Sequence, residues 1–274
     1  MSLGTGVCAV YTQHASPGKG IGLFANKNLS AGARILEEAP AVRAPKGAHP
    51  IEIYRQVKHL GQQSVMKLQQ YATLTSSSSE PKLEGWFQLI ADYLNSHPDI
   101  AFMEFPDIQR RKPVQRYAIF VNNCFEIEGE DDSVEQAVFL KAARLNHSCL
   151  PNCYASWNRE YKLLRVYAVR DIQKGEELTI AYCPAKTMVE DLKIRKERLL
   201  RDCGFVCRCP ACDEHTSLSR KIDAKRKEMA SLPLESDIHL FPDPRKDLAP
   251  YELQGSLYQL QIEQGFGTWE TGKA

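Results

Sequence analysis

The 274-residue sequence carries almost no net charge and no long hydrophobic run. Its 35 Lys and Arg residues and 34 Asp and Glu residues give a net charge of +1. A charge this small does not indicate tight, sequence-independent binding of nucleic acid. No apolar stretch approaches the roughly 20 residues that cross a bilayer, and no charged leader precedes an apolar segment at the N-terminus. We therefore expect an intracellular monomer, nuclear or cytoplasmic, that binds neither membrane nor specific nucleic-acid sequences.

A disulfide framework is also missing. The nine cysteines are an odd number, and Cys207, Cys209 and Cys212 lie too close together to bridge one another comfortably. In a reducing compartment this usage favours a metal ion over disulfides. The hydrophobic content of 43% and the charged content of 25% are those of an ordinary globular protein, long enough for one large domain or two modest ones.

Short strands and turns are predicted near the start of the chain. Apolar residues alternate over 7–11, as in a half-buried strand. The loop at 16–22 contains three glycines, which let the backbone approach a ligand closely, although a plain hairpin turn has the same composition. The segment from Ala25 to Ile35 is echoed at 168–178, which predicts two similar hairpins in one β-rich domain.

Between the two copies, residues 45–115 read as a helical insertion framed by prolines. One amphipathic helix is expected from Ile53 to Tyr71 and a second over Glu84–Ser96. The apolar side of the second helix is predicted to be buried and consists of Trp86, Leu89, Ile90 and Tyr93.

The same periodicities predict the later elements. They indicate strands at 119–125, 164–168 and 178–182 and helices at 136–145, 188–202, 216–232 and 253–260. The Lys and Arg residues of the helix at 188–202 are expected to face solvent. The last two helices belong to a C-terminal extension that packs against the functional site, binds a partner or is partly disordered.

The densest polar stretch of the chain is Arg144–Cys153. It places an amide, an imidazole, a hydroxyl and two thiols close together, on Asn146, His147, Ser148, Cys149 and Cys153. Such groups can be buried only if each has a partner. A ligand, a metal or the backbone must supply those partners.

A metal site is predicted at the cysteine cluster. Cys207, Cys209 and Cys212 can point three thiolates at one ion, whereas a structural zinc ion takes four ligands in a tetrahedron. The residues alone leave the fourth ligand open, and the candidates are Cys149, Cys153, Cys203 and His147.

Four segments in order carry a resemblance to a known family. They are Gly20–Ala25 (GIGLFA), Leu145–Asn152 (LNHSCLPN), Gly175–Tyr182 (GEELTIAY) and Gly204–Cys212 (GFVCRCPAC). Together they resemble the SET-domain protein lysine methyltransferases with a cysteine-rich post-SET tail, and the helical insertion is most similar to that of the SMYD branch and its fungal SET relatives. The resemblance covers roughly residues 5–213.

The resemblance implies an α+β, β-rich SET-domain fold made of small β-sheets with a pseudoknot. Its expected parts are the N-terminal SET part at 5–44, a helical insertion at 45–115, the C-terminal SET part at 116–185, a linking helix and post-SET zinc segment at 186–213, and a helical extension at 214–274.

It also implies transfer of a methyl group from S-adenosylmethionine to a lysine of a protein substrate, histone or non-histone. Tyr182 falls at the family's catalytic tyrosine, and Phe125 is expected to line the lysine channel with it. The implied cofactor-binding residues are Lys19, Gly20, Ile21, Gly22, Asn123, Asn146, His147, Tyr182 and Phe205, and the implied Zn²⁺ ligands are Cys149, Cys207, Cys209 and Cys212.

Two features depart from the SMYD pattern. The chain has no second cysteine–histidine array for a MYND module, and Cys203 occupies the position of an aromatic channel residue. A smaller residue there widens the channel, which leaves an alternative: a SET-fold interaction module with weak or lost catalysis. A zinc-stabilised nucleic-acid binder is a third hypothesis, which the near-neutral charge disfavours.

Overall fold

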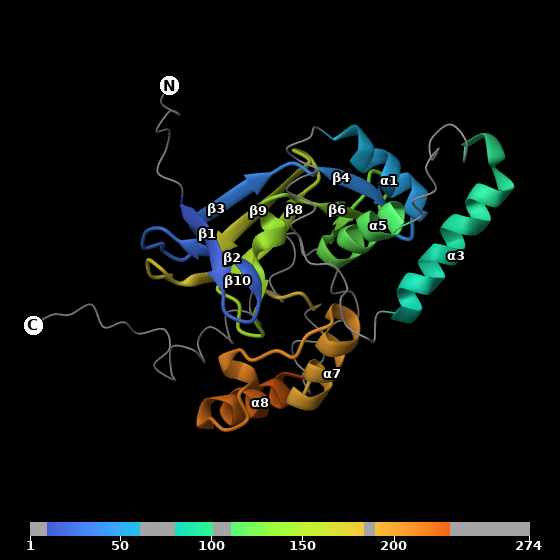
Figure 1. Cartoon of the computed structure of the whole chain (residues 1–274). Coiled ribbons are helices and arrows are strands. Elements are labelled where there is room, and N and C mark those ends of the chain that lie inside the picture. Colours follow the sequence, from blue (N-terminus) through green and yellow to red (C-terminus); the bar gives the residue numbers. More distant parts are fainter. Residues whose placement is uncertain (1–9, 61–79, 101–110, 184–189, 231–274) are drawn as a thin grey trace, which may run out of the picture.

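The computed structural model describes residues 10–60, 80–100, 111–183 and 190–230 (Figure 1). Three small sheets form its centre, with strand orders β1-β2-β10-β7, β3-β9-β8 and β4-β6-β5. The strands are β1 (Tyr11–Ser16), β2 (Gly20–Ala25), β3 (Arg34–Glu38), β4 (Val42–Pro45), β5 (Phe125–Glu128), β6 (Val134–Val138), β7 (Asn146–His147), β8 (Cys153–Asn158), β9 (Leu163–Ala168) and β10 (Glu177–Ile180). The helices are α1 (Pro50–His59), α3 (Glu80–Ser96), α5 (Arg111–Asn123), α7 (Leu192–Cys203) and α8 (Ser217–Ala230), with short 3-10 turns at Ala142–Arg144 and Pro210–Cys212.

The main core is formed by side chains from all three sheets. Leu23 of β2, Val166 of β9, Leu178 of β10 and Phe139 are fully buried there. Each such side chain contributes about 1.5–3 kcal/mol on burial. The alternation predicted at 164–168 is confirmed by β9, and that at 178–182 by β10, which ends two residues before Tyr182.

The two echoed segments pair with each other, so the prediction of two separate hairpins is wrong. Strand β2 of the first copy pairs with β10 of the second, and β3 pairs with β9. Leu29 and Ile172 exchange both backbone hydrogen bonds at 2.8 Å. Gly32 N donates to Ala168 O at 2.8 Å, and Gly175 N donates to Ala25 O at 2.7 Å.

Side chains in the same turns repeat this reciprocal arrangement. Asn28 Oδ1 accepts from Lys174 N, and Asp171 Oδ1, the matching position of the other copy, accepts from Ala31 N, both at 2.9 Å. The sequence echo therefore reflects a local two-fold arrangement. It brings the start of β10 against β2, which positions the site described below.

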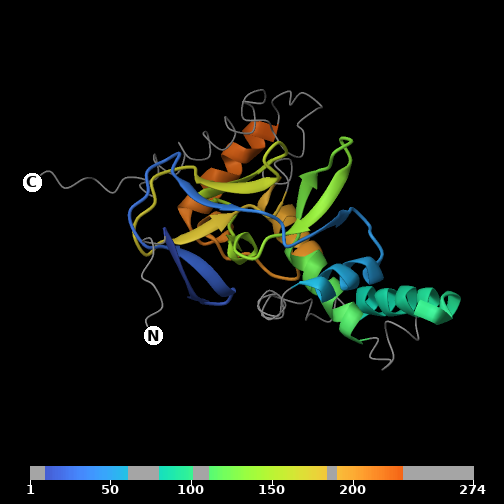
Figure 2. The same ribbon diagram turned by 90° about the horizontal axis from the view of Figure 1, so that it is seen from above.

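Helices α1, α3 and α5 gather at one end of the molecule, with α3 outermost (Figures 1 and 2). The predicted first helix is confirmed as far as His59. Its predicted continuation is wrong at Leu60, whose extended backbone ends α1, and 61–71 lies outside the described residues. The second is confirmed as α3, with Ile90 buried and Trp86 and Tyr93 packed beside it. Leu89 is 49% exposed, so its predicted burial is wrong.

Two later predictions of secondary-structure type are wrong. In a strongly apolar segment, the spacing of apolar residues does not distinguish a helix from a strand. The run Ile119–Asn123 belongs to α5, which is buried on two sides, and the strand begins only at Phe125. The predicted helix at 136–145 is instead β6 followed by a 3-10 turn. As the central strand of its sheet, β6 pairs on both edges and is apolar at Ala137 and Val138.

The C-terminal part forms a separate group of helices below the sheets in Figure 1. Helix α7 begins where the Asp191 side chain accepts a hydrogen bond from Ile194 N, and ends at Gly204, whose φ of +77° suits glycine. Helix α8 confirms the element predicted at 216–232, whereas 253–260 lies outside the described residues. None of the described helices is long and apolar enough to span a membrane.

Candidate active site and metal centre

The polar stretch at 144–153 lies beside the end of β10. Strand β7 pairs with β10 in parallel, with Asn146 opposite Thr179 and His147 opposite Ile180. Because successive side chains of a strand point to opposite faces, the two motif residues serve different neighbours. Asn146 contacts Ile21 in the glycine segment of β2, Gly20–Gly22. His147 contacts Tyr182 and Cys149 of the cysteine cluster.

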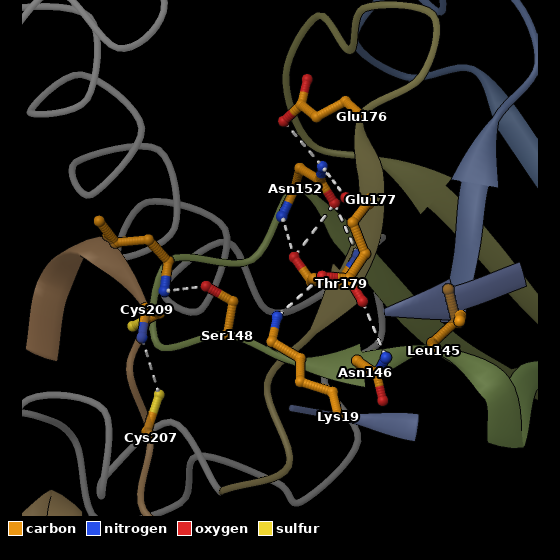
Figure 3. A network of polar contacts seen from close by, with 12 residues as sticks. Lys19, Leu145, Asn146, Ser148, Asn152, Glu176, Glu177, Thr179, Cys207 and Cys209 are labelled. Atoms are coloured by element: carbon orange, nitrogen blue, oxygen red, sulfur yellow. Dashed lines mark hydrogen bonds and ion pairs between the residues drawn. The ribbon is translucent and has the colours of Figure 1, made fainter. Parts of the chain in front are cut away.

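Glu177 joins Asn146 to the glycine segment (Figure 3). Its two carboxylate oxygens accept hydrogen bonds from Asn146 Nδ2 and Lys19 Nζ, each at 2.8 Å. A Cβ on Gly22 would lie 2.7 Å from Glu177 Oε1 and 2.9 Å from Asn146 Nδ2. The structure thus brings Lys19, Gly22 and Asn146 together as predicted. We call Lys19, Gly22, Asn146 and Glu177 the Gly22 cradle; Glu177 and Asn146 approach Gly22 so closely that a side chain at this position would displace them.

The rest of the polar stretch is satisfied by the protein itself, as Figure 3 shows for Asn152. Asn152 Nδ2 donates to Glu177 O at 2.8 Å, and its Oδ1 accepts from Thr179 N at 2.8 Å. Ser148 Oγ accepts from Leu150 N at 3.0 Å. Asn152 and Ser148 are therefore structural, which leaves Asn146, His147 and Cys149 for a ligand or metal.

Removal of the Glu177 charge is expected to destabilise the fold in a pH-dependent way. Burial alone would raise the pKa of Glu177, but hydrogen bonds from Lys19 and Asn146 outweigh it and hold the pKa below its usual value. The stabilisation is therefore complete above the unfolded pKa of about 4.3 and is lost as pH falls through the lower folded pKa. We expect the melting temperature of Glu177→Gln to lie below that of the wild type at pH 7, by a gap that closes in this acidic range.

Thermal scans of both proteins between pH 7 and pH 3 measure that gap, with the exposed Glu160→Gln as the matched control. A gap that stays constant down to pH 3 would show that the carboxylate charge contributes nothing.

His147 links Tyr182 to Cys149. Its Nδ1 accepts a hydrogen bond from Tyr182 N at 3.0 Å, and its Nε2 lies 3.3 Å from Cys149 Sγ. A backbone N–H can only donate, so Nδ1 is unprotonated and Nε2 carries the hydrogen that points at the sulfur. The imidazole is buried, and its orientation is fixed at both nitrogens.

Three rings meet at this point. The His147 and Phe205 centroids are 5.7 Å apart, those of His147 and Tyr182 5.3 Å, and Phe205 meets Tyr182 edge-on at 6.2 Å. The structure therefore brings together His147, Tyr182 and Phe205, which come from three of the four motif segments. Phe205 follows α7, so the segment after this helix closes this side of the site.

The Tyr182 hydroxyl points inward, although 42% of the residue is exposed. Its oxygen donates to Leu145 O at 2.8 Å. Burial, reinforced by charge on Cys203 and Glu177, raises the pKa of Tyr182 well above its usual value. The hydroxyl is therefore protonated at neutral pH and serves as an oriented donor.

Two predicted site residues have other contacts. Phe125 lies on β5 and packs edge-on against Phe139, with centroids 5.6 Å apart. Asn123 ends α5, and its Nδ2 donates to Ile119 O at 2.7 Å. These contacts do not test the channel role of Phe125 or the cofactor role of Asn123, and both stay predictions.

The four cysteines named as zinc ligands form one buried cluster. The sulfurs of Cys149, Cys207, Cys209 and Cys212 all lie within 4.8 Å of one another. Cys149 Sγ is 4.0 Å from Cys207 Sγ and 3.5 Å from Cys212 Sγ, close to the edge of about 3.8 Å of a tetrahedron with Zn–S bonds of about 2.3 Å. The donor set fits a structural zinc ion.

The alternative fourth ligands lie elsewhere or play another part. Cys153 Sγ points away from the cluster and donates to Asn152 Oδ1 at 3.3 Å in the main core. Cys203 is only partly buried and lies outside the group of four. His147 contacts the ligand Cys149 instead of joining the four.

Sequence reasoning missed Glu177, Arg195 and Arg226. Glu177 stands beside the chemically identical Glu176, and only the pairing of β10 with β2 turns it toward Gly22. Arg195 was expected to face solvent on α7 but is buried, as is Arg226 on α8. In each case the only signal was a charged residue within a segment that packs on the site.

The family model of the SET domain matches residues 20–183, which include the glycine segment, the Asn146–His147 pair and Tyr182. The chain belongs to the SET-domain family. Its fold is the SET-domain fold, with small sheets, several helices and a four-cysteine cluster compatible with a post-SET zinc site.

Curated relatives agree with this assignment. Histone-lysine N-methyltransferase set5 of Schizosaccharomyces pombe is 29% identical over 225 residues, which cover 81% of this chain and 56% of that protein. The SET domain-containing protein L678 of Acanthamoeba polyphaga mimivirus is 27% identical over 71% of this chain and 74% of its own length. Histone-lysine N-methyltransferase SMYD3 of Homo sapiens is 33% identical over 49% of this chain and 30% of its own length.

The chain thus spans about half the length of its set5 relative and less of SMYD3. Among solved structures, Rubisco LSMT bound to AdoMet covers 73% of this chain at 16% identity with a TM-score of 0.37. A likeness at that level adds nothing to the assignment.

Proposed function

We propose that the chain is an S-adenosylmethionine-dependent protein-lysine N-methyltransferase. The observation that carries the proposal is the convergence of four separate segments on one site: the Gly22 cradle, the Asn146–His147 pair, Tyr182 and Phe205. Curated relatives named histone-lysine methyltransferases support the reaction class and a protein lysine as its substrate.

The protein's own groups divide the work. S-adenosylmethionine, when bound, supplies the electrophilic methyl group. At the Gly22 cradle, Lys19 and Glu177 carry opposite charges and Asn146 offers an amide. These groups suit the zwitterionic methionine end of the cofactor. Phe205 offers a ring for stacking on the adenine.

Tyr182 aligns the methyl donor with the lysine amine. Its hydroxyl oxygen is fixed by the hydrogen bond to Leu145 O, and its backbone N–H is fixed on His147 Nδ1. An in-line displacement gains most from alignment and from exclusion of water. The lysine must lose its proton to become nucleophilic, and an apolar channel lined by Phe125 and Tyr182 lowers the lysine pKa and so assists that loss to water.

The rival function is an interaction module that has weak or lost catalysis. The observation that favours it is Cys203, which lies near enough to the Tyr182 hydroxyl to affect its pKa and replaces an aromatic residue. The zinc-loaded chain should be tested by calorimetry for S-adenosylmethionine binding and by labelled methyl transfer to core histones and soluble lysate protein. Binding with transfer supports the enzyme, binding without transfer supports the module, and no binding refutes the cofactor proposal.

Partner and location belong to the same proposal. A histone or another protein with an accessible lysine is the proposed substrate. None of the described cysteines forms a disulfide, which suits a reducing compartment, so we place the protein in the nucleus or cytoplasm. Action as a monomer without sequence-specific nucleic-acid binding stays a prediction.

Gly22→Ala is expected to weaken binding of S-adenosylmethionine by about tenfold or more while leaving the fold intact. The added methyl group would strike the ends of the Glu177 and Asn146 side chains, which can swing away without moving the backbone. Their displacement destroys the cradle, and tenfold corresponds to about 1.4 kcal/mol. Calorimetric titration measures the affinity, and a thermal scan monitors the fold.

Gly85→Ala is the control, because its Cβ would meet no atom within 4 Å. If Gly22→Ala binds the cofactor as tightly as Gly85→Ala does, the cradle has no part in recognition.

A further inference from the structure

Two arginines lie buried beside the four-cysteine cluster. Arg195 of α7 is 1% exposed and Arg226 of α8 is 0% exposed. A buried guanidinium is costly unless an opposite charge and hydrogen-bond acceptors meet it. The partners of the two arginines differ.

Arg195 has a carboxylate partner in this region, although its Nε, like that of Arg226, is buried without a hydrogen-bond partner in the described part of the chain. Its Nη1 pairs with Asp223 Oδ1 of α8 at 3.0 Å and also donates to Glu190 O. Its Nη2 donates to Ala211 O at 3.3 Å. Asp223 supplies the counter-charge, so this pair is close to neutral as a unit.

Arg226 forms no such ion pair with a carboxylate in the described part of the chain. Its Nη2 donates to Cys149 O, whereas its Nε and Nη1 are buried without a hydrogen-bond partner in the described part of the chain. The acceptor of Nη2, Cys149 O, belongs to one of the four clustered cysteines.

A zinc ion with four thiolates carries two negative charges, because each bound cysteine is deprotonated. The cysteine residues are all buried, so water does not screen that charge. We propose that Arg226 is the buried counter-charge of the metal centre, and that α8 docks firmly only when the metal is bound. The proposal rests on occupancy of the zinc site, not on methyl transfer.

The packing of α8 supports this dependence. Leu218 and Ile222 pack into the same cluster as the four cysteines, and Ser219 Oγ donates to Ala211 O at 3.1 Å. The described contacts of α8 thus include the cysteine turn, Cys149 and Arg195 of α7. Without the ion, thiols replace the dianionic centre and Arg226 remains a buried cation without compensation.

Zinc affinity, measured by competition with a chromogenic chelator, tests the role of Arg226. Arg226→Met is expected to weaken zinc binding by about tenfold or more, as loss of an outer-shell partner does. Arg226→Lys, which keeps the charge, should lose less. Arg220→Met is the matched control on the exposed face of α8 and should bind zinc as the wild type does. Equal affinities of Arg226→Met and Arg220→Met would overturn the proposal.

Hydrogen exchange on the unaltered full chain tests the docking of α8 and needs no variant that must fold. Removal of zinc by a chelator should raise amide exchange in 217–230 well above any change in α5. Unchanged exchange in 217–230, or failure of the wild type to bind zinc, would overturn the proposal. Neither readout depends on methyl transfer, so a catalytically inactive protein that meets both expectations would refute the proposed enzyme and leave this inference standing.

Discussion

Tyr182→Phe is expected to lower the rate of methyl transfer by on the order of 10²-fold or more while leaving affinity for S-adenosylmethionine nearly unchanged. The substitution removes the buried hydroxyl that donates to Leu145 O, and it keeps the ring and the backbone hydrogen bond to His147. Loss of one oriented donor at a reacting centre commonly costs a factor of this size. Radiolabelled transfer measures the rate, and calorimetry measures the affinity.

Tyr161→Phe provides the matched control. Tyr161 is 59% exposed between β8 and β9, and its ring lies over Arg165, an arrangement that phenylalanine keeps. Transfer by Tyr182→Phe at the rate of Tyr161→Phe would remove the hydroxyl from the mechanism.

Loss of one zinc ligand is expected to have the largest effect on stability. Cys212→Ser should leave less than one zinc ion per chain and lower the melting temperature by about 10 °C or more, because a structural zinc ion contributes folding energy directly. Cofactor binding should weaken as well, since Cys149 of the same cluster contacts His147, which holds the backbone of Tyr182. Elemental analysis, thermal scans and calorimetry measure the three effects.

Cys153→Ser tests the same chemistry outside the cluster. Its thiol donates to Asn152 Oδ1, and a serine hydroxyl can do likewise. This variant should keep about one zinc ion per chain. Zinc content and melting temperature that are equal in Cys212→Ser and Cys153→Ser would show that the four sulfurs do not form a metal site.

The sequence could predict which residues of the short motifs lie together, because their residue types and their order along the chain identify them. Cys149 was selected as the fourth ligand by resemblance, and its sulfur lies with those of Cys207 and Cys212. Asn146 and Gly22 were likewise assigned to one site and lie together. A thiol or a glycine constrains its surroundings strongly, so a short motif suffices.

What depends on non-local pairing could not be predicted. Glu176 and Glu177 are indistinguishable in sequence, yet the first pairs with Arg170 and the second faces Asn146 and Lys19. The two echoed segments suggested local hairpins because a hairpin is the nearest way to pair two strands. Their actual partners lie in the other copy, which no local pattern specifies.

Buried charge was equally hidden. The Arg residues of α7 looked like a solvated face because most basic residues on an amphipathic helix are exposed. Arg195 is buried with Asp223 as its ion-pair partner, and for Arg226 we propose the charge of the metal centre in the same role. A sequence pattern cannot reveal such compensation before the metal centre is located.

Mass-spectrometric mapping of the transferred methyl group is the decisive test of whether this chain methylates protein lysines. The zinc-loaded chain is incubated with labelled S-adenosylmethionine, core histones and soluble lysate protein, beside Tyr182→Phe. We expect label on lysine side chains of a protein substrate, and strongly reduced label with Tyr182→Phe. Label on other residue types, or no label from a wild-type chain that holds both zinc and cofactor, would contradict it.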